Sequence, residues 1–171
     1  LTSFVKRYPS SLHTADVHLR LGDYFYQTSR SYLQAAGSYK AVVDNRTATP
    51  QARQQAIWML LRSYEKAYEY DAAHRTAERL LKEFPDHPKA RNTRLTIGIL
   101  LTEKGQYAQA INHLGEILEW AKGDQASEAY FYLGLAYQNL GDYRKAIETY
   151  YRISYYGAES STGWITSADF Q

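Results

Sequence analysis

Apolar and small residues recur along the chain with the three- and four-residue spacing of one face of an α-helix. The same pattern returns four times, and each copy aligns on a tyrosine that follows a turn. These tyrosines lie 38, 37 and 36 residues apart, at Tyr32, Tyr70, Tyr107 and Tyr143. A small residue stands three positions after each of them, at Ala35, Ala73, Ala110 and Ala146. Because the helical spacing is present on both sides of each turn, the pattern predicts four amphipathic helical hairpins.

The first helix of each predicted hairpin carries an apolar residue followed, in three of the four copies, by glycine. The pairs are Leu21-Gly22, Leu60-Leu61, Ile97-Gly98 and Leu133-Gly134. A glycine inside a helix costs about 1 kcal/mol relative to alanine, so it needs a packing reason. We interpret it as the point where the two helices of a hairpin approach most closely. The second copy has Leu61 instead, and the first has one extra residue before Tyr32. Both departures predict local shifts in hairpin packing.

The pattern predicts an all-α protein in which successive hairpins stack into a solenoid. We expect a single array with turns near residues 29–31, 67–69, 104–106 and 140–142. Its four repeats are expected at residues 15–48, 54–87, 91–124 and 127–160. Residues 1–8 fit the end of a preceding second helix. Residues 161–171 fit the start of a further first helix, since Trp164 lies thirty-four residues after Tyr130. We therefore expect the natural protein to continue in both directions, or its end helices to act as caps.

The arrangement L-G-x2-Y, followed by G-x-Y-x2-A-x3-Y, resembles the tetratricopeptide repeat, and residues 127–156 match it closely. The resemblance extends over nearly the whole chain. It implies a right-handed α-solenoid of stacked helical hairpins. It also implies a non-enzymatic scaffold for protein–protein interactions, with a partner bound on a concave wall made of first helices.

The linkers before two of the first helices are longer than the standard tetratricopeptide linker. From Pro9 to Gly22, and again from Pro85 to Gly98, the distance is thirteen residues. An aromatic-proline pair with this longer lead is similar to the arrays of bacterial cell-envelope proteins. These include the Tol–Pal-associated periplasmic protein and the lipoproteins of outer-membrane protein assembly. The resemblance implies a location in the periplasm or at the periplasmic face of the outer membrane, with the cytoplasm as the alternative.

Composition excludes several classes of function. The net charge of the 171 residues is only +2, so no charge excess favours nucleic acid or an anionic membrane as a partner. There is no cysteine, which excludes disulfides and thiol catalysis but leaves the compartment open. No apolar run approaches the ~20 residues that a membrane span needs. The seventeen tyrosines are unusual, and tyrosine is favoured at protein interfaces.

Motifs for catalysis or cofactor binding are missing from the sequence. The five histidines are His13, His18, His74, His87 and His113. Their spacing does not let two of them share a metal ion. Glu65 and Glu69 lie among basic residues at helical spacing, which indicates a solvated face rather than a general acid–base pair. Cations near Trp58 are interleaved with acids, unlike the basic stripe of a nucleic-acid binder. We therefore expect no enzyme activity, cofactor, metal or nucleic-acid partner.

The first helices contain positions that the packing pattern does not use, and these predict a partner-binding wall. They are Leu19, Asp23, Tyr26, Trp58, Arg62, Glu65, Leu95, Ile99, Thr102, Phe131, Leu135 and Gln138. Trp58 and Phe131 are the expected anchors, because aromatic residues often dominate binding energy. The alternative is that neighbouring helices cover them. Chaperone-binding tetratricopeptide domains hold carboxylates with Lys and Asn at such positions. Here only Arg62 is cationic, so we expect no carboxylate clamp.

Two functions of different class fit this sequence. The favoured one is a scaffold that binds an extended or helical segment of a partner protein. The alternative is structural self-assembly into a homo-oligomer. In that case an end helix carrying Trp164, Ile165 and Phe170 would dock on another copy of the chain.

Overall fold

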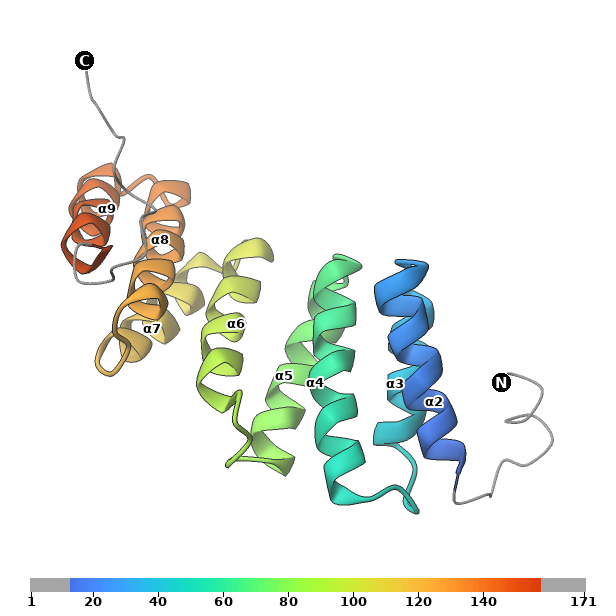
Figure 1. Ribbon diagram of the computed structural model, residues 1–171. Coiled ribbons are helices and arrows are strands. Elements are labelled where there is room, and N and C mark those ends of the chain that lie inside the picture. Colours follow the sequence, from blue (N-terminus) through green and yellow to red (C-terminus); the bar gives the residue numbers. More distant parts are fainter. Residues whose placement is uncertain (1–12, 158–171) are drawn as a thin grey trace. The chain divides into compact units, whose positions relative to one another are not determined.

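The computed structural model describes residues 13–157, and every regular element in that range is helical. The chain divides into two compact units, residues 1–90 and 91–171. Each unit contains two of the four predicted hairpins (Figure 1). The end helices predicted for residues 1–8 and 161–171 lie outside the described residues.

The first unit is built from two hairpins that share one hydrophobic core. Helix α2 (Thr14–Asp23) continues into the π-helix η1 (Tyr24–Thr28), and both pack against α3 (Tyr32–Val43). Helix α4 (Pro50–Lys66) packs against α3 and against α5 (Tyr70–Glu83). The start of α4 is capped, because Thr49 accepts a hydrogen bond from the Ala52 N–H at 3.2 Å. The residues buried in the core are Ala15, Ala35, Ala36, Tyr39, Val42, Val43, Ala56, Ile57, Leu60 and Leu80.

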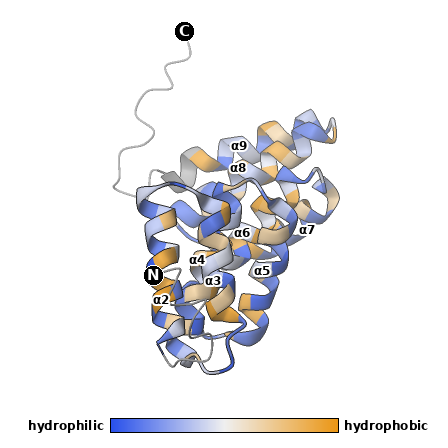
Figure 2. Cartoon of the chain, turned by 90° about the vertical axis from the view of Figure 1, so that its right-hand side faces the viewer, coloured by the Kyte–Doolittle hydropathy of each residue, from blue (hydrophilic) through white to orange (hydrophobic). Residues whose placement is uncertain are grey.

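The second unit repeats this plan with α6 (Ala90–Glu103), α7 (Tyr107–Leu118), α8 (Asp124–Asn139) and α9 (Tyr143–Gly157). Helix α7 packs against α8, and α8 packs against α9. A hydrogen bond joins α6 to α7, since His113 Nε2 lies 2.8 Å from the Arg94 carbonyl oxygen. Hydrophobic and hydrophilic residues alternate along the helices (Figure 2), as amphipathic hairpins require.

The four hairpin turns lie where the sequence predicts them, at residues 29–31, 67–69, 104–106 and 140–142. Each turn has a residue with a positive φ, at Arg30 (50°), Tyr68 (59°), Gly105 (73°) and Gly141 (81°). In three turns the residue before the tyrosine donates its N–H to a carbonyl five residues earlier, as Asp142 does to Tyr137 at 3.0 Å. The left-handed conformation costs a residue other than glycine about 1–2 kcal/mol. The turn geometry is therefore kept even where no glycine is present.

The π-helix η1 explains how the first hairpin accommodates its extra residue. A π-helix has a wider turn, and inserting one residue into an α-helix commonly produces it. The turn bond from Ser31 to the Phe25 carbonyl, at 2.8 Å, spans six residues where the other three hairpins span five. The insertion is thus absorbed between Tyr24 and Thr28, and the start of α3 keeps its register.

The glycines of the first helices lie directly beneath large side chains of the second helices. A Cβ added at Gly22 would lie 2.5 Å from the Tyr39 ring, and one added at Gly134 would lie 2.5 Å from the Tyr150 ring. At Gly98 the same position lies 2.5 Å from Leu114. These distances are far below van der Waals contact, so the predicted close approach of the two helices is confirmed. Tyr39 is fully buried, and its hydroxyl donates to Asp23 Oδ1 at 2.6 Å.

The second hairpin keeps this packing with the sizes of the two residues exchanged. Leu61 stands at the glycine position, and Ala77 stands where Tyr39, Leu114 and Tyr150 stand in the other hairpins. Both Leu61 and Ala77 are fully buried. A large residue on the first helix is therefore combined with a small one on the second, and the volume is filled from the opposite side.

Ion pairs on the surface of the first unit connect three of its helices. Arg79 of α5 contacts Asp44, which follows α3, at 2.9 Å, and it contacts Glu83 at 2.6 Å. Glu83 also accepts a hydrogen bond from Arg53 of α4 at 2.7 Å. The hydrogen bond to Glu83 raises the pKa of Arg79 above its ordinary value, and the bond to Asp44 adds to this effect. Single exposed pairs contribute at most about 1 kcal/mol, but here the charges form a network.

The close contact at Gly134 gives a first prediction. Alanine normally stabilises a helix interior by about 1 kcal/mol relative to glycine. Gly134→Ala should instead lower the free energy of unfolding by about 1–3 kcal/mol, because its methyl group displaces the Tyr150 ring. Gly115→Ala is the matched control in the same unit, since an added Cβ would meet no atom within 4 Å beyond its chain neighbours and the nearby backbone of its own helix. It should stabilise the protein. Urea unfolding measures the free energy of unfolding of both variants. An equal change in this free energy for Gly134→Ala and Gly115→Ala would contradict the packing argument.

Candidate functional site

Three of the predicted binding residues of α4 lie together on one face of the helix. The guanidinium carbon of Arg62 lies 6.0 Å from the centroid of the Trp58 ring. Arg62 also forms an ion pair with Glu65 at 3.0 Å. The Trp58 ring is half-buried rather than exposed, because it packs against the core of the first unit. Sequence spacing placed these three residues on one face, and in the structure Arg62 lies near both Trp58 and Glu65.

His87 completes this group, although sequence reasoning did not include it. Its ring stacks on Trp58 with the centroids 6.2 Å apart and an interplanar angle of 29°. The ring is held in place, since Nδ1 accepts the Lys89 N–H at 3.0 Å. Burial lowers the pKa of His87, against a smaller raising effect of a hydrogen bond to the backbone of Gln54. We call Trp58, Arg62, Glu65 and His87 the Trp58 cluster. His87 lies in the linker after α5, where no helical periodicity could indicate its position.

The predicted residues of α2 and η1 have mainly structural contacts. Leu19 and Tyr26 pack against the core of the first unit, and the Tyr26 ring lies edge-on to Tyr32 at 5.5 Å. Asp23 accepts the hydrogen bond from buried Tyr39. Its carboxylate therefore already has an internal partner, and a bound protein would have to share it.

The predicted residues of the second unit differ widely in exposure. Leu95 and Thr102 are buried, at 3% and 4% exposure, and Ile99 is half-buried. Phe131 is 48% exposed, and its ring lies edge-on to Tyr132 at 5.2 Å. Leu135, four residues after Phe131, is half-buried, and Gln138 accepts a hydrogen bond from the Tyr150 hydroxyl at 3.1 Å. We call Phe131, Leu135 and Gln138 the Phe131 surface. Leu95 and Thr102 do not line an accessible face in this structure.

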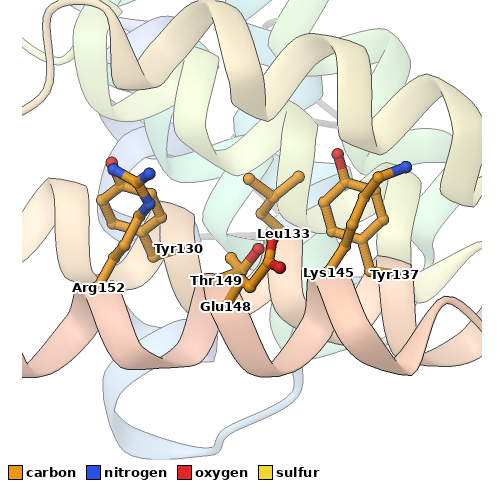
Figure 3. A pocket seen from close by; sticks show the side chains of 7 residues that line it. All are labelled: Tyr130, Leu133, Tyr137, Lys145, Glu148, Thr149 and Arg152. Carbon is orange, nitrogen blue, oxygen red and sulfur yellow. The ribbon is translucent and has the colours of Figure 1, made fainter.

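A pocket of about 250 Å³ lies between α8 and α9 (Figure 3), lined by Tyr130, Leu133, Tyr137, Lys145, Glu148, Thr149 and Arg152. The Lys145 ammonium lies 5.3 Å from the centroid of the Tyr137 ring and 2.9 Å from Asp142. The first unit has a pocket of the same volume, lined by Lys40, Leu60, Tyr64, Ala72, Arg75, Thr76 and Arg79. Six lining positions of the two pockets align in the repeat, and four of them carry the same residue type, at Leu133, Tyr137, Thr149 and Arg152. The two pockets therefore arise at the same repeat positions, from the packing of the two helices of a hairpin.

The described residues contain no group of three or more histidine and acidic side chains that could hold a metal ion. Among the helices between residues 13 and 157, none is long and apolar enough to cross a membrane. What the site offers is aromatic and cationic surface for contact with another molecule.

Comparison with known proteins identifies the repeat. Residues 95–161 match a family model described as "Tetratricopeptide repeat". A solved structure described as "MamA AMB-1 P212121" is 16% identical to this chain with a TM-score of 0.66, over 86% of this chain and 75% of that one. Another, described as "Crystal structure of MamA protein", is 17% identical with a TM-score of 0.52, over 91% and 97% of the two chains. At this identity the likeness shows a shared fold. No curated protein matches the sequence.

The position of His87 predicts a pH dependence of stability. Because burial lowers the pKa of the folded ring, the unfolded chain binds the proton more readily. The neutral, buried His87 ring makes its full contribution to the free energy of unfolding above the unfolded pKa of about 6.5. This contribution is lost as the pH falls from that value through the lowered folded pKa. Urea unfolding between about pH 7 and pH 5 should therefore show declining stability.

His87→Gln should remove part of this decline, because glutamine keeps an acceptor without titrating. His18, whose pKa is also lowered by burial, accounts for a further part. His13→Gln is the control, since its side chain is exposed. An unchanged pH dependence in His87→Gln would show that the ring titrates equally in both states.

Proposed function

We propose that the chain is a non-enzymatic tetratricopeptide-repeat scaffold that binds a segment of a partner protein. The support is the match of residues 95–161 to the tetratricopeptide-repeat model, together with the all-helical hairpin fold. The contacts would come from the Trp58 cluster in the first unit and the Phe131 surface in the second. Apart from His87, which comes from the linker after α5, these residues lie on first helices, where the packing of each hairpin leaves one face unused. Each surface can be considered by itself, because each is formed within one unit.

The observation that carries the proposal is the support given to the Trp58 ring. His87 stacks on it, the core contacts it, and Arg62 lies near the ring centroid. Binding costs entropy when flexible side chains must be ordered. A ring that is already fixed avoids most of this cost. Tryptophan and arginine are also the residue types most often responsible for binding energy at interfaces.

The Phe131 surface supports the same function by its exposure. A phenylalanine that is 48% exposed leaves apolar area in water, and covering it is worth about 25 cal/mol per Å². Gln138, seven residues later on the same helix, supplies an exposed polar group. An apolar centre with a polar rim is the usual composition of a protein-binding surface. An extended or helical segment with one or two large apolar side chains would match it.

We propose the periplasm, or the periplasmic face of the outer membrane, as the location of this scaffold, with the cytoplasm as the alternative. The support is the thirteen-residue spacing from Pro85 to Gly98, which resembles that of bacterial envelope proteins. The partner would then be a component of the envelope. Fractionation of cells that express the full-length natural protein tests this directly. Recovery in the cytoplasmic fraction would reject the location and leave the scaffold function intact.

Substitutions on the two surfaces test the binding function. A partner captured with the whole chain as bait should bind Phe131→Ala and Arg62→Ala at least about thirtyfold more weakly, a cost of about 2 kcal/mol. Titration calorimetry measures the affinity. Trp58→Ala is a poorer variant, because it removes part of the core packing and leaves a cavity.

Tyr68→Ala is the matched control, since Tyr68 is a 76% exposed aromatic residue in a hairpin turn. It should bind as the natural sequence does. Circular dichroism should show the same helix content in all three variants. Equal affinity of Phe131→Ala, Arg62→Ala and the control would reject these surfaces as the binding site.

A further inference from the structure

The pocket of the first unit is bordered by three cationic side chains. Lys40 lies on α3, and Arg75 and Arg79 lie on α5. The other residues that line it are Leu60, Tyr64, Ala72 and Thr76, so none of its seven lining residues is acidic. Leu60 and Thr76 are buried, whereas Lys40 and Arg75 are exposed. The pocket therefore combines a buried part with positive charges that reach solvent. We call it the Arg75 pocket.

Acidic side chains nearby neutralise these charges only in part. Asp44 accepts a hydrogen bond from Lys40 and contacts Arg79 at 2.9 Å. Glu83 contacts Arg79 at 2.6 Å, and it is shared with an arginine of α4. Arg75 takes part in none of the ion pairs between side chains of residues 13–157. The pocket thus keeps an excess of positive charge after its internal pairs are formed.

The three cations still have hydrogen-bond donors for an anion. Arg79 uses Nε and Nη1 for its two acids, but a guanidinium carries five N–H groups. The Lys40 ammonium carries three, of which Asp44 accepts one. The planar fork of Arg75 matches the spacing of carboxylate and phosphate oxygens. An anion in the pocket could therefore accept hydrogen bonds from all three side chains.

The equivalent pocket of the second unit has a different charge. Figure 3 shows Glu148 between Lys145 and Arg152 along α9. Glu148 stands at the repeat position of Arg75, so an acid replaces a base among otherwise similar lining residues. Its carboxylate would repel an anion. An anion site is therefore expected in the first unit, although both pockets have the same volume.

We propose that the Arg75 pocket binds a phosphate group, either the free ion or a phosphate monoester. A phosphate monoester carries about −1.5 to −2 charge and three strong acceptor oxygens, so it matches three cations better than a single carboxylate does. The pocket volume of about 250 Å³ suits a small ligand, since pockets for drug-sized molecules measure roughly 300–1,000 Å³. None of its lining residues belongs to the Trp58 cluster or the Phe131 surface. The proposal is therefore independent of the scaffold function, and either can fail alone.

Titration calorimetry of the whole chain with phenyl phosphate tests this site. At about pH 7.5, where the ester is a dianion, one molecule should bind per chain, and added salt should weaken the binding. Arg75→Glu should weaken it at least about tenfold, because the pocket then has the acid that the second unit has. Benzoate has the same ring with a single negative charge, and it should bind at least about tenfold more weakly than phenyl phosphate.

Arg152→Glu is the matched control, because it makes the same charge change at an exposed arginine of the other pocket. It should leave the affinity for phenyl phosphate unchanged, and circular dichroism should show that both variants remain folded. Absence of binding, or an equal loss of affinity in the two variants, would overturn the proposal. Equal affinity for benzoate would also overturn it, since the pocket would then not select phosphate.

Competition with inorganic phosphate distinguishes the two sources of the phosphate group. Displacement of phenyl phosphate at similar concentrations would support the free ion as the ligand. Displacement only by a large excess would support a phosphate monoester. A failure to displace at any concentration would overturn the proposal, because the phenyl ring alone would then account for the binding.

Discussion

Within each hairpin, one residue of the first helix and one of the second share a single fixed volume. In three hairpins the first helix contributes only a glycine, and the space above it is filled by Tyr39, Leu114 or Tyr150. Because protein interiors are packed as densely as organic crystals, this shared volume sets the distance between the two helices. The tyrosine hydroxyls also find partners, at Asp23 and Gln138, so burial of the ring leaves no polar group unsatisfied.

The accessible surfaces follow from that constraint. The side of a first helix that faces its hairpin partner is occupied by packing, so functional variety is confined to the remaining side. There the two units differ, since one presents a half-buried tryptophan supported by histidine and arginine, and the other an exposed phenylalanine. The same fold can therefore present different chemistry in each repeat without altering its core.

Much of the fold could be predicted from the sequence, because repetition multiplies weak signals. The four turns and the close approach at Gly22, Gly98 and Gly134 follow from spacing alone. The candidate surface was harder to predict. Leu95 has the same repeat position as Trp58 and Phe131, yet it is 3% exposed, since burial depends on neighbours that periodicity does not specify. His87 could not be predicted, because it lies in a linker without helical periodicity. Its stacking on Trp58 depends on the path of that linker, which the sequence pattern does not specify.

The exchanged sizes of Leu61 and Ala77 limit how this array could evolve. To convert the second hairpin to the glycine-and-tyrosine arrangement, two substitutions are needed. Leu61→Gly alone would open a void, and Ala77→Tyr alone would force two bulky side chains into one space. Neither intermediate is neutral, so the two positions should covary among descendants of this sequence. Recombination would face the same barrier, because a crossover within a hairpin would join incompatible halves. Whole hairpins are thus the units that such a gene can duplicate or exchange without loss of stability.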